Sequence, residues 1–380
     1  QKDIRTFYST LYRLLLFPHN ITEAGRYMSP YDGKVHQGQM FTDVGFWDVA
    51  RAAQPFLTLF YPEVSELMVD GMLDTFAQSG HLPQWASPDH RNVMVGNHAD
   101  CVLADAIVKG IRRDRAADAL RAMIDDQTQV GFNQATGRDG VAMYNSKGYV
   151  DSSHDGSVSK TLDYAWNDFC ISRVAQLTGA KSTVKTFTEK AKNYLNVYDT
   201  SIKFFRAKDK AGHFTSFDKF RWGSGFVEGN PFHYRFSVPH DIHALIKLAG
   251  GDAAFVAQLE DVFSQPAKVN VGTYGFMIHE MKEMVAIKMG QYAHGNQPIQ
   301  HMLYLYNYAG AAAKGQARIR TVMERLYDDT ENGYCGDEDN GQTSAWFVLS
   351  ALGFYPVCPG TDQYVIGSPL FARVEARLPG

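Results

Sequence analysis

The chain has 380 residues, 45% of them hydrophobic and 21% charged, a composition typical of a globular protein with a large core. Its 37 basic and 41 acidic side chains give a formal net charge of −4, which argues against nucleic acid as the main partner. No apolar run approaches the roughly 18 residues of a membrane span, so we expect no membrane-spanning segment.

Four cysteines are too few for a disulfide scaffold, and they lack the Cys-x-x-Cys spacing of a metal site. The aromatic content of 13% fits either a thick core or a carbohydrate site, where ring faces stack on sugar C–H groups. The chain opens on Gln1 without Met or a signal peptide, and it stops soon after a strand-like stretch at 371–376. We therefore expect a part of a longer protein whose targeting segment has been removed.

Apolar residues recur at helical spacing along most of the chain. In chain order this pattern predicts helices over residues 3–17, 45–60, 63–80, 98–111, 115–129, 157–178, 182–198, 239–249, 252–264, 276–290, 298–313, 315–328 and 341–353. Short strands are expected only near residues 214–217 and 364–366.

Long loops rich in Gly, Asn, Asp and aromatic residues follow alternate helices. We predict an all-α dominated fold with short β hairpins, in which antiparallel helix pairs close into an (α/α)6 toroid or barrel. The loops at one end would then form a funnel that carries the chemistry. An α-solenoid is the alternative, but the helix spacing is too irregular for the known repeat periods. Residues 1–360 would form this domain, and residues 361–380 would begin a C-terminal β segment.

The loop 335–342 carries three consecutive carboxylates and runs directly into the apolar helix 343–349. Neighbouring carboxylates repel one another, whereas a helix N-terminus stabilises negative charge. If the loop lines a cavity, Asp337 and Asp339 can hold a metal, activate a water or bind sugar hydroxyls. The alternative is a surface turn that caps the helix. The loop does not fit an EF-hand, because Gly341 takes the fifth position.

A second acidic candidate, Glu228, lies between Val and Gly in an aromatic stretch, with Trp222 just upstream. Loss of solvation in such surroundings raises the pKa of a carboxylic acid and keeps it protonated as a proton donor. The alternative is an ordinary turn or helix-end residue.

Amide oxygens at Asn296 and Gln297, just before a proline, suit either a helix cap or a hard cation such as Ca²⁺. His279-Glu280 resembles the start of the HExxH motif, but the second His is absent, which argues against a zinc protease. Further polar residues stand in aromatic or Gly-rich contexts at helix starts, in segments 46–48, 82–85, 96–100 and 157–164. One shared funnel explains their common position better than separate caps do.

Taken together, these segments resemble the glycoside hydrolase family 92 α-mannosidases. The resembling stretches follow the family's order along nearly the whole chain. They are FWD (46–48), GNHAD (96–100), SVSKTLDYAWND (157–168), EGN (228–230), VPHD (238–241), HGNQP (294–298), LYNYAG (305–310) and GDEDNGQTSAWFVLSALGFYPVCPG (336–360).

The resemblance implies a Ca²⁺-dependent, exo-acting mannosidase that inverts anomeric configuration. It matches Glu228 to the general acid, and Asp337 and Asp339 to the aspartates that handle the water, with Asp339 favoured as the base. It matches His279 and Glu280 to the pair that binds the leaving mannose in members selective for α-1,2 linkages, and both are intact here. We therefore expect α-1,2-linked mannose, in an N-glycan or a mannan, as the substrate. Another linkage is the alternative.

We expect the pocket for the terminal sugar to be lined by Trp47, Asp48, Trp85, His98, Asp100 and Lys160. Oxygen chemistry and closeness to the matched motifs point to Ca²⁺ ligands at Asn230, Glu283 and Gln297. The resemblance also implies a flanking N-terminal β-sandwich domain, absent from this chain, that adds a residue to the rim of the site. We expect a secreted, periplasmic or cell-surface protein of a bacterium.

An inverting hydrolase needs its acid and base on opposite faces of the sugar, roughly 6.5–9.5 Å apart, so that a water fits between. Two rival interpretations remain open. A non-catalytic mannose-binding toroid would keep the aromatic rim without an isolated acid and a carboxylate pair. A helical scaffold for protein partners would instead carry charged grooves on its outside.

Overall fold

A computed structural model describes residues 1–128 and 135–378 of the chain. Helices dominate this part, and in chain order the α-helices are α1 (Lys2–Leu14), α2 (Phe46–Val49), α3 (Ala53–Phe60), α4 (Pro62–Ser79), α5 (Ala99–Val108), α6 (Ala116–Thr128), α7 (Val141–Lys147), α8 (Ser157–Thr178), α9 (Lys181–Lys190), α10 (Pro231–Tyr234), α11 (Ile242–Ala249), α12 (Asp252–Ser264), α13 (His279–Ile287), α14 (Ala312–Leu326) and α15 (Gln342–Leu352). Segments of 3-10 helix are η1 (Arg113–Arg115), η3 (Asn193–Val197), η4 (Pro239–Asp241), η5 (Gly272–Tyr274) and η6 (Gln297–Ala309). The last residue of the helix predicted over 115–129 lies outside the described residues.

The strands are short and form two-stranded antiparallel pairs. The pairs are β1 (His19–Asn20) with β4 (Phe41–Thr42), β2 (Arg26–Met28) with β3 (Val35–Gln37), β5 (Val44–Gly45) with β6 (Trp85–Ala86), β7 (Tyr198–Asp199) with β8 (Phe204–Phe205), and β9 (Phe354–Tyr355) with β10 (Val365–Ile366). The strand expected near 364–366 is confirmed by β10. The one expected near 214–217 is wrong, because only Phe214 pairs there, as an isolated bridge with Lys208.

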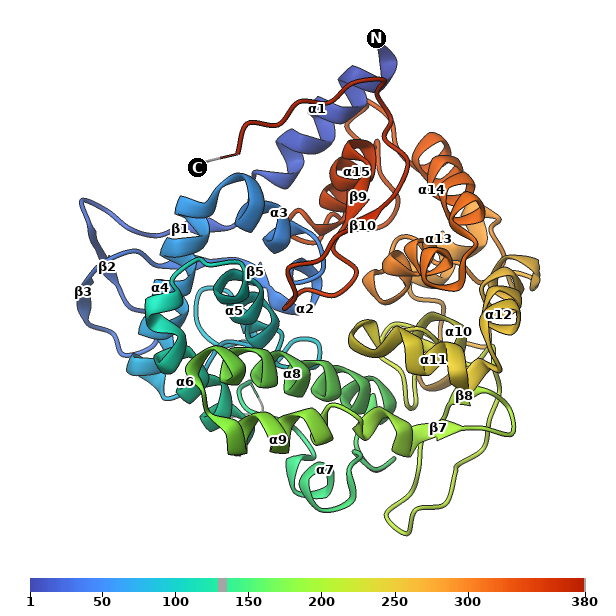
Figure 1. Cartoon of the computed structure of the whole chain (residues 1–380), viewed down its shortest axis with the longest axis horizontal. Coiled ribbons are helices and arrows are strands. Elements are labelled where there is room, and N and C mark those ends of the chain that lie inside the picture. Colours follow the sequence, from blue (N-terminus) through green and yellow to red (C-terminus); the bar gives the residue numbers. More distant parts are fainter. Residues whose placement is uncertain (129–134, 379–380) are drawn as a thin grey trace.

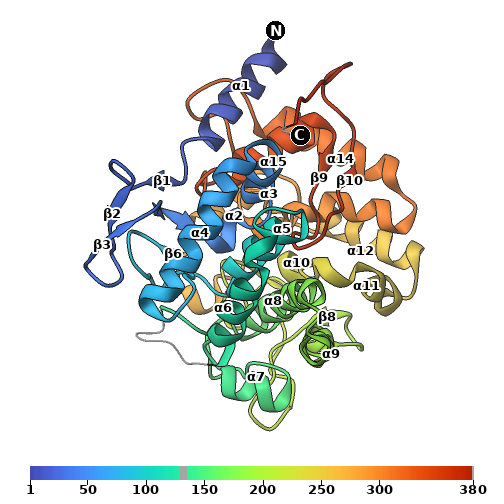
Figure 2. The same ribbon diagram turned by 60° about the vertical axis from the view of Figure 1, so that its left-hand side comes forward.

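The helices follow one another around a ring in sequence order (Figure 1). Packing contacts join α3 to α5, α5 to α8, α8 to η4, η4 to α11, α11 to η6 and η6 to α15, and α15 packs back against α3. Figure 2 shows α1 at one end of the molecule beside α15, against which it packs. The predicted helix-dominated fold is confirmed, and its grouping into antiparallel pairs of a barrel stays a prediction. In the described part of the chain, no helix has the length and apolar character to cross a membrane.

Burial separates the helices that line the ring from those that cover it. In α15 every residue from Gln342 to Ala351 is buried, so this helix is enclosed on all sides. On α14 the buried residues are Gly315, Ile319, Val322 and Met323, a single stripe at helical spacing. Helices with one apolar stripe have a face that can meet water, and they therefore form the outer layer.

The helices predicted over 45–60 and 298–313 take other forms in the structure. The helix predicted over 45–60 is split into α2 and α3, because the side chain of Gln342 accepts hydrogen bonds from the N–H groups of Ala52 and Ala53 at 2.9 and 3.1 Å. These bonds satisfy donors that the first turn of a helix leaves unpaired. The helix predicted over 298–313 is instead the 3-10 segment η6, whose Gln300 carbonyl accepts from the indole of Trp346.

A substitution at Gln342 would test how far the stability of the ring depends on such buried polar contacts. Its amide N–H also donates to Gln300 Oε1 at 3.0 Å, so the side chain joins α3, η6 and α15. We expect Gln342→Leu to lower the free energy of unfolding by about 2–4 kcal/mol, since it leaves buried N–H groups without partners. Urea denaturation measures this, with Gln176→Leu at an exposed position of α8 as the control. Equal midpoints for the two variants would contradict the role given to Gln342.

Candidate active site

The acidic loop 335–342 contacts two other loops where α15 begins. A Cβ on Gly336 would lie 2.6 Å from the Cα of Gly295, and Gly336 has a φ of +77°, so both space and backbone geometry require glycine there. On the other side, Asn340 Oδ1 accepts a hydrogen bond from Gly45 N at 2.9 Å. The loop therefore brings together segments from near residues 45, 295 and 340.

The three neighbouring carboxylates of this loop have different surroundings. Glu338 caps α15, since its carboxylate accepts hydrogen bonds from the backbone N–H groups of Gly341 and Ser344. The capping interpretation is thus correct for this residue. Asp337 is 71% exposed. Asp339 is half-buried, and its carboxylate accepts a hydrogen bond from the amide of Gln297.

The pKa of Asp339 is raised to about 7, and burial is the largest cause. The nearby charges of Asp337 and Glu338 also raise this pKa, whereas the hydrogen bond from Gln297 lowers it. The backbone of Asp339 has a φ of +54°, a left-handed conformation that non-glycine residues rarely adopt. Such a conformation persists only where surrounding contacts hold it.

Glu228 is also held in a left-handed conformation, with a φ of +46°. Its N–H donates to Tyr274 Oη at 2.8 Å, and its carbonyl accepts from Asn296 Nδ2 at 2.8 Å. Burial is the largest cause that raises the pKa of Glu228 to about 8, and the charges of Glu280 and Asp339 contribute to the same increase. The predicted direction and its predicted cause, desolvation, both agree with the structure. The catalytic role of Glu228 stays a prediction.

The first turn of α13 places an imidazole among carboxylates. His279 Nε2 lies 3.0 Å from Glu280 Oε1 and 3.9 Å from Asp337 Oδ2, and its Nδ1 lies 3.0 Å from Glu283 Oε1. Burial lowers the pKa of His279, but the hydrogen bond to Glu283 and the neighbouring negative charges outweigh it and raise that pKa above its ordinary value. Glu280 is only 6% exposed, and burial raises its pKa.

Glu228, His279 and Glu280 face one cavity of about 490 Å³. Lys160 and Tyr274 line it as well, and Lys160 Nζ donates to Asp139 Oδ2 at 2.6 Å. A cavity of this size fits a small polar ligand of one or two rings. The acid candidate Glu228 and the pair His279 and Glu280 on α13 thus line the same cavity.

Asp48 belongs to the same group of carboxylates. It is 2% exposed, and burial raises its pKa well above the ordinary value, with the charges of Asp339 and Glu228 as the next causes. Trp85 and Asp48 both lie against Gly45. A Cβ added to this glycine would be 2.5 Å from the Trp85 ring and 2.7 Å from Asp48 Oδ2. The structure therefore brings two of the predicted pocket residues to the acidic loop.

Three further predicted pocket residues, Trp47, His98 and Asp100, are each at most 1% exposed. Trp47 is buried, and its indole N–H donates to Asp163 Oδ2 at 3.2 Å. His98 lies 3.9 Å from the same carboxylate.

Asp100 is fully buried 3.8 Å from Arg138, which binds Asp168 at 2.8 Å. Neither His98 nor Asp100 lines the cavity that Glu228 faces. Within the described ranges, Asp100 thus belongs to a buried ionic cluster rather than to the cavity.

Two of the three predicted Ca²⁺ ligands are compatible with that role. Glu283 has a buried oxygen, Oε2, that finds no hydrogen-bond partner among the described residues, and Gln297 contacts Asp339. Asn230 fits poorly, because its oxygen accepts from Phe232 N to cap α10. No group of three or more His, Cys, Asp or Glu in residues 1–128 and 135–378 is arranged as a metal site.

Two residues hold the acid candidate in place in a way that the sequence did not predict. Tyr274 could have been found from its position between glycines just before His279. Asn296 was recognised only as a cap or a cation ligand. It does cap η6, since its Oδ1 accepts from Gln297 N, but it also binds the carbonyl of Glu228.

Comparison with known proteins agrees with this arrangement. The chain matches the model of the glycosyl hydrolase family 92 catalytic domain over residues 1–380. A family 92 inverting mannosidase from Bacteroides thetaiotaomicron has 48% sequence identity and a TM-score of 0.88, over 97% of this chain and 51% of that chain. A family 92 α-mannosidase from the same organism, solved in complex with mannoimidazole, has 30% identity and a TM-score of 0.86, over 97% and 49%.

A curated relative, an uncharacterized secreted glycosidase of Arthroderma benhamiae, is 24% identical over 99% of this chain and 46% of its own length. The chain thus spans about half the length of the relatives it matches. Because the family model covers it from end to end, the chain belongs to the catalytic domain family of the family 92 glycosyl hydrolases.

Proposed function

We propose that the protein is an inverting exo-α-mannosidase that hydrolyses terminal α-1,2-linked mannose from oligosaccharides. The observation that carries this proposal is the convergence of Glu228, Asp339 and Asp48. The charge of Asp339 helps to raise the pKa of Glu228, and the charges of Asp339 and Glu228 help to raise the pKa of Asp48. The 48% identity to an inverting mannosidase and the mannoimidazole complex of another relative support the reaction and the sugar.

In the proposed reaction, Glu228 gives its proton to the glycosidic oxygen as the C–O bond breaks. Asp339, with Asp337 beside it, takes a proton from the water whose oxygen attacks the anomeric carbon. The raised pKa of Glu228 keeps it protonated near neutral pH, as a general acid requires. The hydrogen bond from Gln297 favours the ionised form of Asp339, as a general base requires.

The α-1,2 linkage is proposed from the pair on α13. His279 and Glu280 line the cavity beside the acid, where the leaving mannose must lie once the terminal mannose occupies the space near Asp339. Glu280 Oε2 is buried without a partner among the described residues and can accept a sugar hydroxyl. A different linkage would present other hydroxyls to this pair.

Calcium dependence is part of the proposal. Repulsion among Asp48, Glu228 and Asp339 raises the pKa of carboxyl groups here, and a divalent cation nearby would offset it. Glu283 and Gln297 would hold the ion through oxygen atoms, which Ca²⁺ prefers. When bound, it would hold the vicinal hydroxyls of mannose and favour a distorted ring.

Further parts of the proposal concern the complete protein. We propose secretion or a cell-surface location in a bacterium, with the curated secreted relative as the support. The N-terminal β-sandwich domain stays a prediction. The natural substrate would be a mannose-containing glycan, either an N-glycan or a mannan.

Replacement of the acid tests the mechanism. We expect Glu228→Gln to lower kcat/KM on α-1,2-mannobiose by about 10²- to 10⁴-fold, because the leaving oxygen loses its proton donor. The loss on an aryl mannoside with a good leaving group should be far smaller, since that group leaves without protonation. Glu331→Gln, at an exposed carboxylate, is the control. Equal losses on both substrates would contradict the acid assignment.

The pH dependence of kcat/KM tests the acid and base together. Activity should rise as pH passes about 7, where Asp339 loses its proton, and fall as pH passes about 8, where Glu228 loses its own. Added Ca²⁺ should move the rising limb to lower pH, since a cation favours the ionised carboxylate. Glu228→Gln should lack the falling limb. A wild-type profile that is flat through both values would argue against this pair.

Removal of the metal tests the calcium proposal separately. We expect EDTA to abolish hydrolysis of α-1,2-mannobiose by the complete protein, and Ca²⁺ to restore it. Titration calorimetry should show Ca²⁺ binding that Glu283→Gln weakens by about tenfold, because one charged ligand is lost. Hydrolysis that is insensitive to EDTA would remove calcium from the proposal and leave the enzyme. No hydrolysis at all would favour a mannose-binding protein.

A further inference from the structure

A second cavity, also of about 490 Å³, lies beside the one that Glu228 faces. Asp155 lines both cavities, and the segment 223–228 forms the wall between them. The first four residues of this segment line the second cavity, and the last two line the first. Thr273 and Tyr274 are divided between the cavities in the same way. The proposed reaction uses only the first cavity.

Hydrogen bonds hold the shared wall at several points. Ser224 N donates to Thr273 Oγ1 at 2.9 Å, and Glu228 N donates to Tyr274 Oη at 2.8 Å. The carbonyl of Gly225 accepts from the first turn of α8 at 2.9 and 3.1 Å. Hydrogen bonds within the protein therefore fix the wall of the second cavity, which lowers the entropy cost of binding a ligand.

Part of the charge around the second cavity is satisfied within the protein. Arg206 donates to Asp199 Oδ2 at 2.9 Å. Asp218 accepts from the backbone N–H of residue 220 at 3.0 Å and from Asn270 Nδ2 at 2.8 Å. Arg206 and Asp218 thus already have partners within the protein. The cavity therefore does not favour a ligand that is strongly positive or strongly negative.

The remaining polar groups include both donors and acceptors. Arg221 donates through Nε to Ser224 Oγ at 3.2 Å, and its charge acts on Asp218. Its two terminal nitrogens donate no hydrogen bond in the described part of the chain. The carboxylate of Asp155 and the hydroxyl of Ser216 are exposed and accept or donate no hydrogen bond within the described ranges. Phe217 adds an aromatic side chain. A neutral, polyhydroxylated ligand with apolar C–H faces matches this mixture.

We propose that the second cavity is a subsite for the sugar units that follow the leaving mannose. The inference rests on the proposed function, because that function places the leaving mannose beside His279 and Glu280. From there, a longer chain would pass Asp155, which lines both cavities, and reach Arg221 and Phe217. The protein would then act on linear oligomannosides of three or more units more efficiently than on the disaccharide.

Substrate length tests the subsite. With the complete protein, kcat/KM should be about tenfold higher for α-1,2-mannotetraose than for α-1,2-mannobiose, the gain expected from a few hydrogen bonds to a charged group. Arg221→Ala, which removes the donors, and Ser216→Trp, which fills the rim, should bring this ratio close to one while leaving the disaccharide rate unchanged. Equal wild-type values for both substrates would overturn the proposal, as would equal losses on both in Arg221→Ala.

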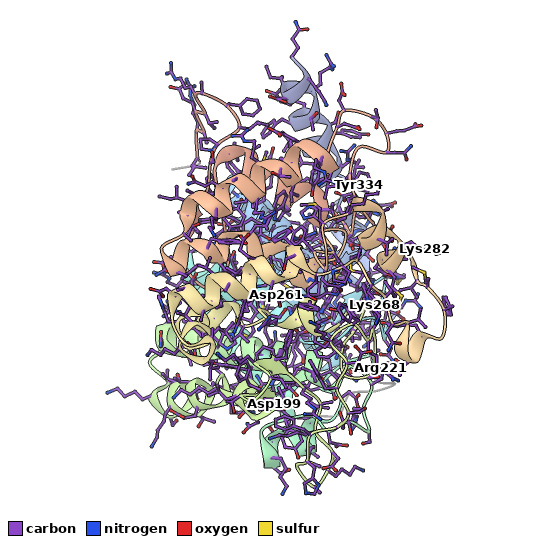
Figure 3. All side chains as sticks on the ribbon, turned by 90° about the vertical axis from the view of Figure 1, so that its right-hand side faces the viewer. Asp199, Arg221, Asp261, Lys268, Lys282 and Tyr334 are labelled. Carbon is purple, nitrogen blue, oxygen red and sulfur yellow. The ribbon has the colours of Figure 1, made fainter. Side chains whose placement is uncertain are left out.

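Lys282→Ala is the matched control. It removes one positive charge from an exposed position that lines neither cavity, and Figure 3 shows Arg221 and Lys282 along the same edge of the molecule. The length ratio of this variant should equal that of the wild type. A ratio close to one would mean that overall charge, rather than the cavity, sets the preference, and would overturn the proposal.

Binding without turnover separates this inference from the proposed function. Calorimetric titration of Glu228→Gln protein with α-1,2-mannotetraose should show an affinity that Arg221→Ala lowers by about tenfold. If the wild type hydrolyses nothing, the proposed function fails, yet this loss of affinity would still support the subsite. Unchanged affinity would overturn it.

Discussion

Removal of carboxylates from water is the constraint on which the site depends. For Glu228, Asp339 and Asp48, loss of hydration is the largest cause of the raised pKa, and repulsion from neighbouring carboxylates adds to it. Neither effect favours folding, so the remainder of the structure must hold these groups together. The same two effects give the site its chemistry, because they leave one group protonated and place another close to its titration point at neutral pH.

Neutral polar side chains and glycines supply much of that support, beside the ion pairs of His279. Gln342 joins three elements of the ring, and the close approach of Gly336 to Gly295 fixes the acidic loop against its neighbour. Left-handed backbone at Glu228 and Asp339 costs of order 1–3 kcal/mol each. Both residues proposed to move protons bear this cost, and at these positions a fixed side-chain direction matters most.

The wall between the two cavities connects the proposed chemistry with substrate length. Segment 223–228 carries the acid at one end and lines the second cavity at the other, and the hydroxyls of Thr273 and Tyr274 hold both ends. Sugar units bound in the second cavity would therefore contact the same segment that positions the proton donor. Binding energy from remote units can in this way contribute to the reaction as well as to affinity.

Local sequence determined most of the helices and the residue types of the site. Helical spacing identified α8 and α15 because it depends only on neighbouring residues, and the motifs around Glu228 and Asp339 carried the resemblance to family 92. Tertiary structure alone decided where buried polar groups find partners: Gln342 divides the helix predicted over 45–60, and Asn230 caps α10. These partners come from distant segments or compete with a metal for the same oxygen. No periodicity along the chain records that choice, because the energy of an unsatisfied buried group depends on which segments meet around it.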